Sequence, residues 1–143
     1  MQSDNIVILE DDLEAARQIE TELLKSLRAT LEQSENLSFV LSARDPHGAL
    51  AGGLTAFASY GWLLVKTLWV SDDFRNHGLG RSLMARAEKK AKALGCHSVW
   101  LDTSNPDAMR FYAKLGYETF GQLANSEEQH PSGHRRWFMK KQL

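Results

Sequence analysis

The segment best suited to binding a ligand is the glycine-containing stretch 75–82, which reads Arg-Asn-His-Gly-Leu-Gly-Arg-Ser. It follows an apolar run that ends at Val70, and it continues into an amphipathic helical pattern. Glycines leave backbone N–H groups uncovered, so several can converge on one anion, and a helix N-terminus adds the positive end of its dipole. Arg75 and Arg81 add full charges. The stretch predicts a phosphate or pyrophosphate site, with a plain glycine turn before a helix as the alternative.

Two common phosphate-binding motifs do not fit this stretch. A P-loop places four residues between its glycines and follows the second glycine with Lys and then Ser or Thr. Here a single residue separates Gly78 from Gly80. A dinucleotide fingerprint needs a third glycine where Leu83 stands, and it belongs to an early βαβ unit.

A second candidate segment lies at 105–117, and Asn105 and Tyr112 are the polar residues of interest in it. Ala108, Phe111 and Leu115 recur there at helical spacing, so we expect them in the core. Tyr112 is one step around the helix from Phe111 and is therefore free to face a cleft. A half-buried tyrosine with one satisfied hydroxyl is the alternative interpretation.

The N-terminal part of the chain is expected to form a strand and a long helix. Residues 6–9 are all apolar and predict an opening strand. Asp11 or Asp12 can cap a helix whose apolar residues recur in steps of three and four. They are Leu13, Ala16, Ile19, Leu23, Leu27 and Leu31. The stretch exceeds twenty residues before it ends at 35–36, so it predicts one helix or two with a bend.

Three strands joined by short turns should follow. Residues 37–43, 49–59 and 62–70 have strand-like apolarity, and the turn signals at 45–48 and 60–61 separate them. The third run is almost continuously apolar, which is typical of a central strand covered on both faces. The three together predict an antiparallel meander.

The pattern then alternates between helix and strand. An apolar stripe predicts a helix that begins at Leu79 and is stopped by Gly95. The remaining predicted elements are a strand at 98–101, a helix from Pro106 to Gly116, and strands at 117–123 and 135–140. The chain is therefore predicted to be one mixed α/β (α+β) domain built on a mixed sheet.

The composition of the chain argues against nucleic-acid binding and against a membrane protein. The chain has 143 residues, of which 43% are hydrophobic and 24% charged, so it is expected to fold as one globular domain. Seventeen Lys and Arg against eighteen Asp and Glu leave a net charge of −1, which argues against a nucleic-acid binder. No apolar run reaches the roughly 18–20 residues that span a bilayer, so no membrane partner is expected.

The cellular compartment is expected to be the cytoplasm. Residues 1–5 contain no basic or apolar region typical of a secretory signal. The single cysteine, Cys96, has no internal disulfide partner and is interpreted as a small buried hydrophobe.

Together the two candidate segments resemble motifs of the GCN5-related N-acetyltransferase (GNAT) superfamily. The first segment resembles the acyl-CoA pyrophosphate loop through Arg75-x-x-Gly78-x-Gly80. The second resembles the other CoA-side motif through Asn105-x-x-Ala108-x-x-Phe111-Tyr112-x-x-Leu115-Gly116-Tyr117. The resemblance covers residues 49–143 well and the first forty only in topology. It implies a GNAT-like fold with one N-acetyltransferase domain over residues 1–143.

The resemblance implies that acetyl-CoA is the co-substrate and that no metal is needed. The pyrophosphate would bind backbone amides of the loop, and the pantetheine arm would pair with the third strand where it splays away from the strand at 98–101. The implied cofactor-binding residues are Leu68, Trp69, Val70, Arg75, Asn76, His77, Gly78, Leu79, Gly80, Arg81, Ser82, Asn105 and Tyr112.

The resemblance also implies direct acyl transfer to an amine, with Val70 and Tyr112 as catalytic residues. The Val70 N–H would polarise the thioester carbonyl, and Tyr112 would protonate the leaving sulfur. Many family members carry a glutamate base on the central strand, but 62–70 contains no carboxylate. The base therefore stays open among water and the side chains of Asp102, Glu127, Glu128, His130 and His134.

The amine acceptor also stays open, as a small molecule or a protein. An aromatic wall of Trp62, Trp137 and Phe138 and the acidic pair at 127–128 would suit a cationic amine. One alternative function is an acetyl-CoA-binding sensor or ligand-sequestering module without turnover. Another is a translation toxin that acetylates aminoacyl-tRNA. Family analogy adds a homodimer through the terminal strands as an option.

Overall fold

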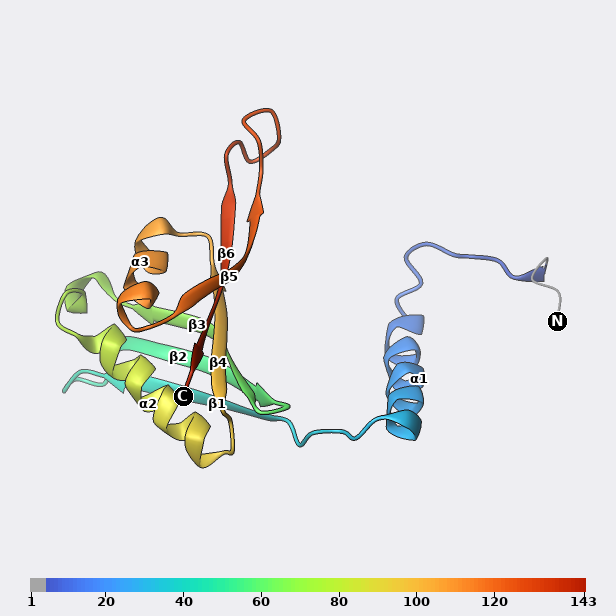
Figure 1. Cartoon of the computed structure of the whole chain (residues 1–143), viewed down its shortest axis with the longest axis horizontal. Coiled ribbons are helices and arrows are strands. Elements are labelled where there is room, and N and C mark those ends of the chain that lie inside the picture. The colour runs from blue at the N-terminus through green and yellow to red at the C-terminus, as the bar shows by residue number, and fades with distance from the viewer. Residues whose placement is uncertain (1–4) are drawn as a thin grey trace. The chain divides into compact units, whose positions relative to one another are not determined.

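The computed structural model describes residues 5–143 (Figure 1). The interpretation of residues 1–5 as free of a secretory signal therefore falls almost wholly outside the described residues. The chain forms two compact units, Met1–Ser34 and Glu35–Leu143. The single domain over residues 1–143 stays a prediction. Across the described residues, every helix is too short or too polar to span a bilayer.

The described part of the first unit, residues 5–34, contains the α-helix α1 at Ala15–Thr30. The predicted strand at 6–9 is wrong, because these residues have no regular secondary structure. A strand requires a hydrogen-bonded neighbour, and the described part of this unit offers no second extended segment.

The predicted ends of this first helix are also wrong, although its type is right. Asp11 has φ 58° and its carbonyl accepts the Leu13 N–H at 3.0 Å, so a turn precedes the helix and the cap position falls on Glu14. At the other end Leu31 is extended, with φ −130° and ψ 142°. The helix is one unbroken element that stops well before 35–36.

The second unit is built on a six-stranded mixed sheet with the order β1-β2-β3-β4-β6-β5. Its strands are β1 Leu37–Arg44, β2 Leu50–Ser59, β3 Trp62–Val70, β4 Ser98–Thr103, β5 Glu118–Ala124 and β6 Arg135–Gln142. β3 and β4 are parallel, and the other neighbours are antiparallel. The predicted mixed α/β fold and the antiparallel meander of β1, β2 and β3 are confirmed.

Two helices and a short 3₁₀ turn complete this unit. They are η2 at Asp72–Phe74, α2 at Leu79–Ala93 and α3 at Pro106–Lys114. α2 packs against β2, β3 and β4, and α3 packs against β4. The buried residues of α2 are Leu83, Met84, Ala87 and Ala91, as the apolar stripe predicts, whereas Leu94 is 40% exposed.

The sheet opens between its two central strands. β3 and β4 pair over three positions, from Trp62 with Ser98 to Leu64 with Trp100. Beyond this point β3 continues to pair with β2 as far as Val70, and β4 continues to pair with β6 as far as Thr103. The predicted splay is confirmed. Toward their C-terminal ends, β3 and β4 therefore each have one edge that faces the gap between them.

Candidate functional site

The loop before α2 has a backbone shape that turns its amides outward. Asn76 and Gly78 both have left-handed conformations, with φ 63° and 79°. Gly78 occupies the N-cap of α2 and supplies no side-chain cap, and the first helical bond runs from the Ser82 N–H to the Gly78 carbonyl at 3.0 Å. The amides of the first helical turn therefore have no acceptor within the helix. The predicted strand–loop–helix arrangement is confirmed. The anion site in it stays a prediction, which the free amides suit.

These amides open into a cavity of about 600 Å³. Its lining includes the predicted residues Leu68, Trp69, Val70, Arg75, Asn76, Gly78, Leu79, Gly80, Arg81 and Tyr112. His77, Ser82 and Asn105 are predicted residues that do not line it. The cavity is therefore built from three separate parts of the chain: the end of β3, the loop with the start of α2, and α3.

Four further residues line the cavity: Phe74, Asp107, Ala108 and Phe111. Ala108 and Phe111 were expected in the core. Their apolar type at helical spacing cannot distinguish a core position from a cavity wall. Phe74 and Asp107 were not predicted to line the site, because each belongs to a short polar stretch that carries no motif of its own.

Two glycines allow the walls of this cavity to approach closely. A Cβ on Gly80 would lie 3.3 Å from Phe111 Cζ, so the first turn of α2 packs directly against α3. A Cβ on Gly52 would lie 2.8 Å from the Trp69 carbonyl oxygen, so β2 and the end of β3 also require a glycine at their contact. Sequence reasoning missed Gly52, although a glycine pair inside a strand is a known sign of close backbone approach.

The Val70 backbone faces the gap between the central strands. The N–H of the next residue, Ser71, donates to the Ala51 carbonyl on the β2 side at 2.8 Å. Successive amides of a strand point to opposite edges, so the Val70 and Leu68 amides point to the β4 side, where the strands have separated. A donor at this position is available to a ligand carbonyl.

Arg75 ties the loop to the end of β3. Its Nε donates to the Val70 carbonyl at 3.1 Å, and its guanidinium pairs with Asp72 at 3.0 Å. Both side chains are mostly exposed, so the ion pair itself contributes little stability. The arrangement keeps a positive charge beside the uncapped helix amides.

Tyr112 enters the cavity from α3 and is 8% exposed. Its carbonyl accepts the Leu115 and Tyr117 N–H groups, both at 3.0 Å, and its ring meets the Phe111 and Tyr117 rings edge-on at 5.2 and 5.9 Å. Burial raises the pKa of the Tyr112 hydroxyl to about 12. The phenol is therefore neutral across the physiological range.

Asn105, which the resemblance implies is a cofactor-binding residue, hydrogen-bonds to its own neighbours in the chain. Its Oδ1 accepts the Asp107 N–H at 2.8 Å, and its own N–H donates to Thr103 Oγ1 at 3.1 Å. It is therefore the N-cap of α3, with Pro106 at the first helical position as expected. Its role in cofactor binding stays a prediction.

The candidate bases lie on β4 and on the hairpin of β5 and β6. Asp102 Oδ2 accepts bonds from Nε and Nη2 of Arg136, both at 2.6 Å, so this carboxylate is already engaged. His134 Nε2 lies 3.4 Å from Ser104 Oγ at the end of β4. Glu127 and Glu128 are exposed in the connection between the two strands.

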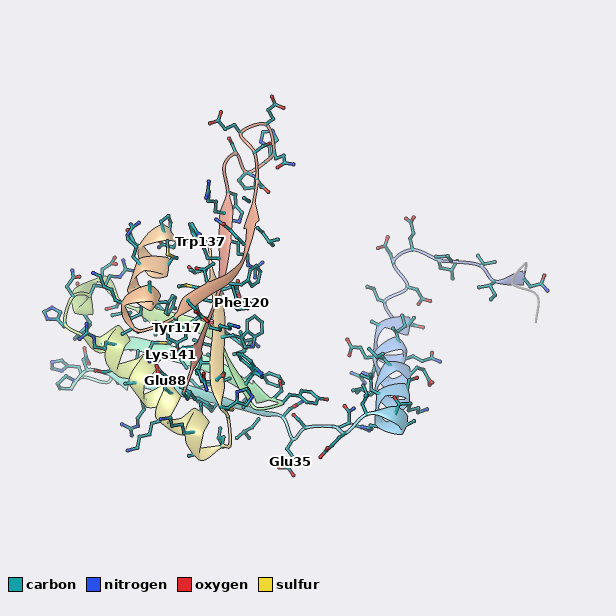
Figure 2. The ribbon with its side chains drawn as sticks, in the orientation of Figure 1. Glu35, Glu88, Tyr117, Phe120, Trp137 and Lys141 are labelled. Atoms are coloured by element: carbon teal, nitrogen blue, oxygen red, sulfur yellow. The ribbon has the colours of Figure 1, made fainter. Side chains whose placement is uncertain are left out.

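The predicted aromatic wall is only partly assembled. Trp137, which Figure 2 labels, pairs with Thr103, and Phe138 pairs with Asp102, at the end of β4 where the strands have separated. Trp62 is at the other end of β3, where it pairs with Ser98 and contacts His97 at 5.2 Å between ring centroids. Including Trp62 in this wall was wrong, because about eight strand residues separate it from Val70.

No group of three or more His, Cys, Asp or Glu side chains within residues 5–143 is arranged to hold a metal ion.

Comparison with known proteins gives concordant results. Residues 6–117 match the model of the Acetyltransferase (GNAT) family. Acetyltransferase Atu2258 of Agrobacterium fabrum is 33% identical over 112 residues, which cover 78% of this chain and 82% of that protein. Blasticidin-S acetyltransferase of Streptomyces morookaense is 35% identical over 123 residues, which cover 84% and 88%.

Solved structures share the fold. An acetyltransferase from Bacillus cereus is 26% identical with a TM-score of 0.84, covering 99% of this chain and 100% of that one. A streptothricin-acetyltransferase-like protein from Bacillus anthracis, solved in complex with acetyl coenzyme A, is 19% identical with a TM-score of 0.65 and covers 80% of this chain and 65% of that one. At that identity the second likeness concerns the fold alone.

The Asn105→Ala variant separates capping from ligand binding. Loss of the cap should lower the free energy of unfolding by about 1 kcal/mol. Since Asn105 does not line the cavity, the acetyl-CoA affinity measured by calorimetry should stay at the parent value. Unchanged urea unfolding combined with weaker binding would contradict the capping role and return Asn105 to the ligand.

The raised pKa of Tyr112 predicts a loss of stability in alkali. Because the folded pKa of about 12 lies above the ordinary value of 10, this group's contribution is complete below pH 10 and is lost as the pH rises toward 12. Urea unfolding of the parent and of Tyr112→Phe should diverge in that window, with the parent losing more stability. Parallel curves between pH 10 and 12 would show that the hydroxyl is not desolvated.

Proposed function

Because the chain belongs to the GNAT family of acetyltransferases, we propose that it transfers an acetyl group from acetyl-CoA directly to a primary amine of a small molecule. One observation carries this proposal. The uncapped N-terminus of α2, Val70 at the end of β3 and Tyr112 of α3 all line the same cavity of about 600 Å³. Anion binding, carbonyl polarisation and proton donation are therefore available within one site.

The start of α2 fits the pyrophosphate of the donor. The amides of Leu79, Gly80 and Arg81 lack helical acceptors, and the left-handed conformations at Asn76 and Gly78 turn the preceding loop toward the same place. Arg81 adds a positive charge to the cavity lining. A cradle of free amides with a nearby cation has the chemistry that diphosphates prefer.

The exposed edge of β3 suits the amide-containing arm of the donor. Leu68 and Val70 line the cavity and direct their amides to the open side of the strand. Main-chain pairing depends little on side-chain type, so the bulky Trp69 between them is compatible with it.

When bound, acetyl-CoA supplies an acetyl group that is activated as a thioester. The Val70 N–H is the proposed donor to the carbonyl oxygen, where negative charge grows as the amine attacks. The Tyr112 hydroxyl is the proposed donor of a proton to the departing sulfur.

A small-molecule acceptor is favoured over a protein by one relative. The Streptomyces morookaense protein, 35% identical to this chain, is named for acetylation of blasticidin S. Trp137 at the open end of β4 offers an aromatic ring to such an acceptor, whereas the next residue, Phe138, points to the opposite face of the sheet and contacts Phe120.

Blocking the proposed pyrophosphate cradle should abolish donor binding. A Gly78→Glu variant places a carboxylate among the free amides, and calorimetric titration with acetyl-CoA should detect no binding. Gly78 has φ +79°, so any side chain there is strained. The matched control is Gly48→Glu in the turn between β1 and β2, where φ is an equivalent +84° and an added Cβ, as at Gly78, would meet no atom within 4 Å. It should bind like the parent, and equal loss in both variants would overturn the assignment of the cradle.

Removing the Tyr112 hydroxyl should slow turnover while sparing donor affinity. Tyr112→Phe is expected to lower kcat by about 10²-fold or more, as for the loss of a general acid. The assay measures CoA release with saturating acetyl-CoA over a panel of primary amines that includes blasticidin S. Unchanged kcat would remove Tyr112 from the chemistry. Tight binding of acetyl-CoA without turnover on any amine would instead favour a sensor.

A further inference from the structure

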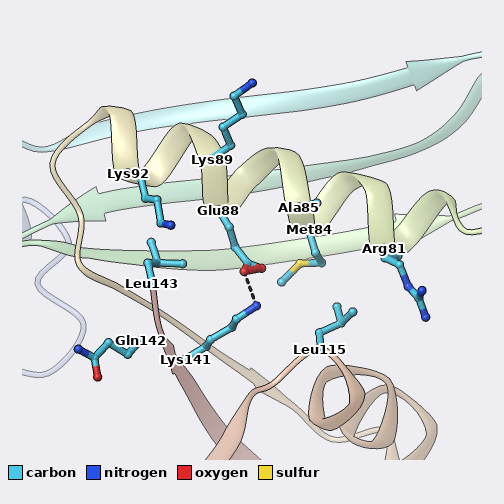
Figure 3. A pocket seen from close by; sticks show the side chains of 10 residues that line it. All are labelled: Arg81, Met84, Ala85, Glu88, Lys89, Lys92, Leu115, Lys141, Gln142 and Leu143. Atoms are coloured by element: carbon cyan, nitrogen blue, oxygen red, sulfur yellow. Dashed lines mark hydrogen bonds and ion pairs between the residues drawn. The ribbon is translucent and has the colours of Figure 1, made fainter.

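A partly buried charged pair joins α2 to β6 beside a second cavity of about 440 Å³ (Figure 3). Glu88 Oε1 accepts from Lys141 Nζ at 2.6 Å, and the two side chains are 14% and 29% exposed. The other carboxylate oxygen, Oε2, accepts from the Tyr117 hydroxyl at 3.4 Å. Figure 2 labels these three side chains close together beside α2. None of them lines the cavity proposed for the donor.

A partly buried ion pair of this kind contributes little net stability to a fold. Removing two charges from water costs several kcal/mol, and well-packed apolar residues often stabilise as much or more. A group of this kind is better explained where it fixes the position of something else. The Tyr117 ring, which is 3% exposed, is the side chain that it holds.

Tyr117 is fixed on several sides. Its N–H donates to the Tyr112 carbonyl at 3.0 Å, its hydroxyl donates to Glu88, and Lys141 Nζ lies over its ring at 5.6 Å from the centroid. Gly116, just before Tyr117, has φ +98°, a left-handed conformation that other residues rarely adopt. Burial and the nearby Glu88 charge raise the pKa of Tyr117 far above its usual value, so its hydroxyl stays a donor at every assay pH.

The Tyr117 ring is in contact with the Tyr112 ring. The two rings meet edge-on, with centroids 5.9 Å apart and planes at 66°. Phe111 approaches the Tyr112 ring at 5.2 Å and 68°. The Tyr112 ring is therefore in contact with two aromatic neighbours, and only Tyr117 is anchored by a hydrogen bond from its far end.

We propose that Tyr117, anchored by Glu88 and Lys141, is a positioning residue that holds the Tyr112 ring in the orientation from which its hydroxyl serves acyl transfer. The catalytic part of this statement rests on the proposed function of Tyr112. The charged pair thus acts through the contact between the Tyr117 and Tyr112 rings, from outside the cavity proposed for the donor.

The test is a double-mutant cycle on the full chain. Tyr117→Phe keeps the ring and removes only its anchor, so kcat should fall by about 2- to 10-fold, the range that one hydrogen bond is worth. The KM for acetyl-CoA should not change. In the Tyr112→Phe background the same substitution should have no further effect, because no hydroxyl is left to position. Turnover is followed with the panel amine that the parent acetylates fastest.

A second readout does not depend on turnover. The chain has three tyrosines, so ring-¹³C-tyrosine NMR gives a small spectrum that Tyr112→Phe assigns. The Tyr112 ring signals should shift and flip faster in Tyr117→Phe and in Glu88→Gln. Lys89→Gln, which removes a neighbouring charge from α2 that the Tyr117 anchor does not use, is the matched control and should leave the Tyr112 signals and kcat unchanged.

The outcomes separate this proposal from the proposed function. Identical Tyr112 signals in Tyr117→Phe and the parent would overturn the positioning role, and so would a loss of kcat that persists in the Tyr112→Phe background. A third outcome is that Tyr112→Phe keeps the parent kcat while Tyr117→Phe still alters the Tyr112 ring signals. In that case the proposed role of Tyr112 as an acid is wrong, and the contact by which Tyr117 positions its ring stands. Thermal unfolding of each variant identifies any loss of activity that is due to unfolding.

Discussion

The separation of β3 from β4 is the constraint on which the site depends. Buried backbone amides must be paired, so a sheet can open only where each strand keeps a partner on its other edge. Here β3 keeps β2 and β4 keeps β6 beyond the last shared pair at Leu64 and Trp100. The opening therefore leaves the edge at Val70 available to a ligand without disturbing the rest of the sheet.

The other parts of the site lie around this opening and are held by close contacts. Gly80 allows the first turn of α2 to pack against Phe111, which brings the uncapped amides and α3 to the same cavity. α3 carries Tyr112, and Tyr117 follows it by a tight turn whose N–H returns to the Tyr112 carbonyl. The Tyr117 hydroxyl donates to Glu88 on α2. Tyr117 lies between α3 and β5, so this bond links α2 to the end of α3.

The predictions that succeeded rest on strong local signals. The turns at 45–48 and 60–61 contain glycines with φ of 84° and 81°, and such turns determine where the three strands begin and end. Gly95, with φ 88°, likewise marks the end of α2. The predictions that failed lacked such signals. Residues 6–9 are apolar enough for a strand, but apolarity does not supply a hydrogen-bonded neighbour.

The amino-acid sequence by itself determined the family, the order of elements after residue 36, and the segments that form the cavity, because glycine spacing and apolar periodicity act locally along the chain. Tertiary structure alone decided which residues of those segments face the cavity. Asn105 caps α3, Asp102 is engaged by Arg136, and Trp62 lies at the far end of β3. The cap at Asn105 is a local contact with Asp107, whereas the position of Asp102 depends on Arg136, which is distant in sequence, and that of Trp62 depends on strand register.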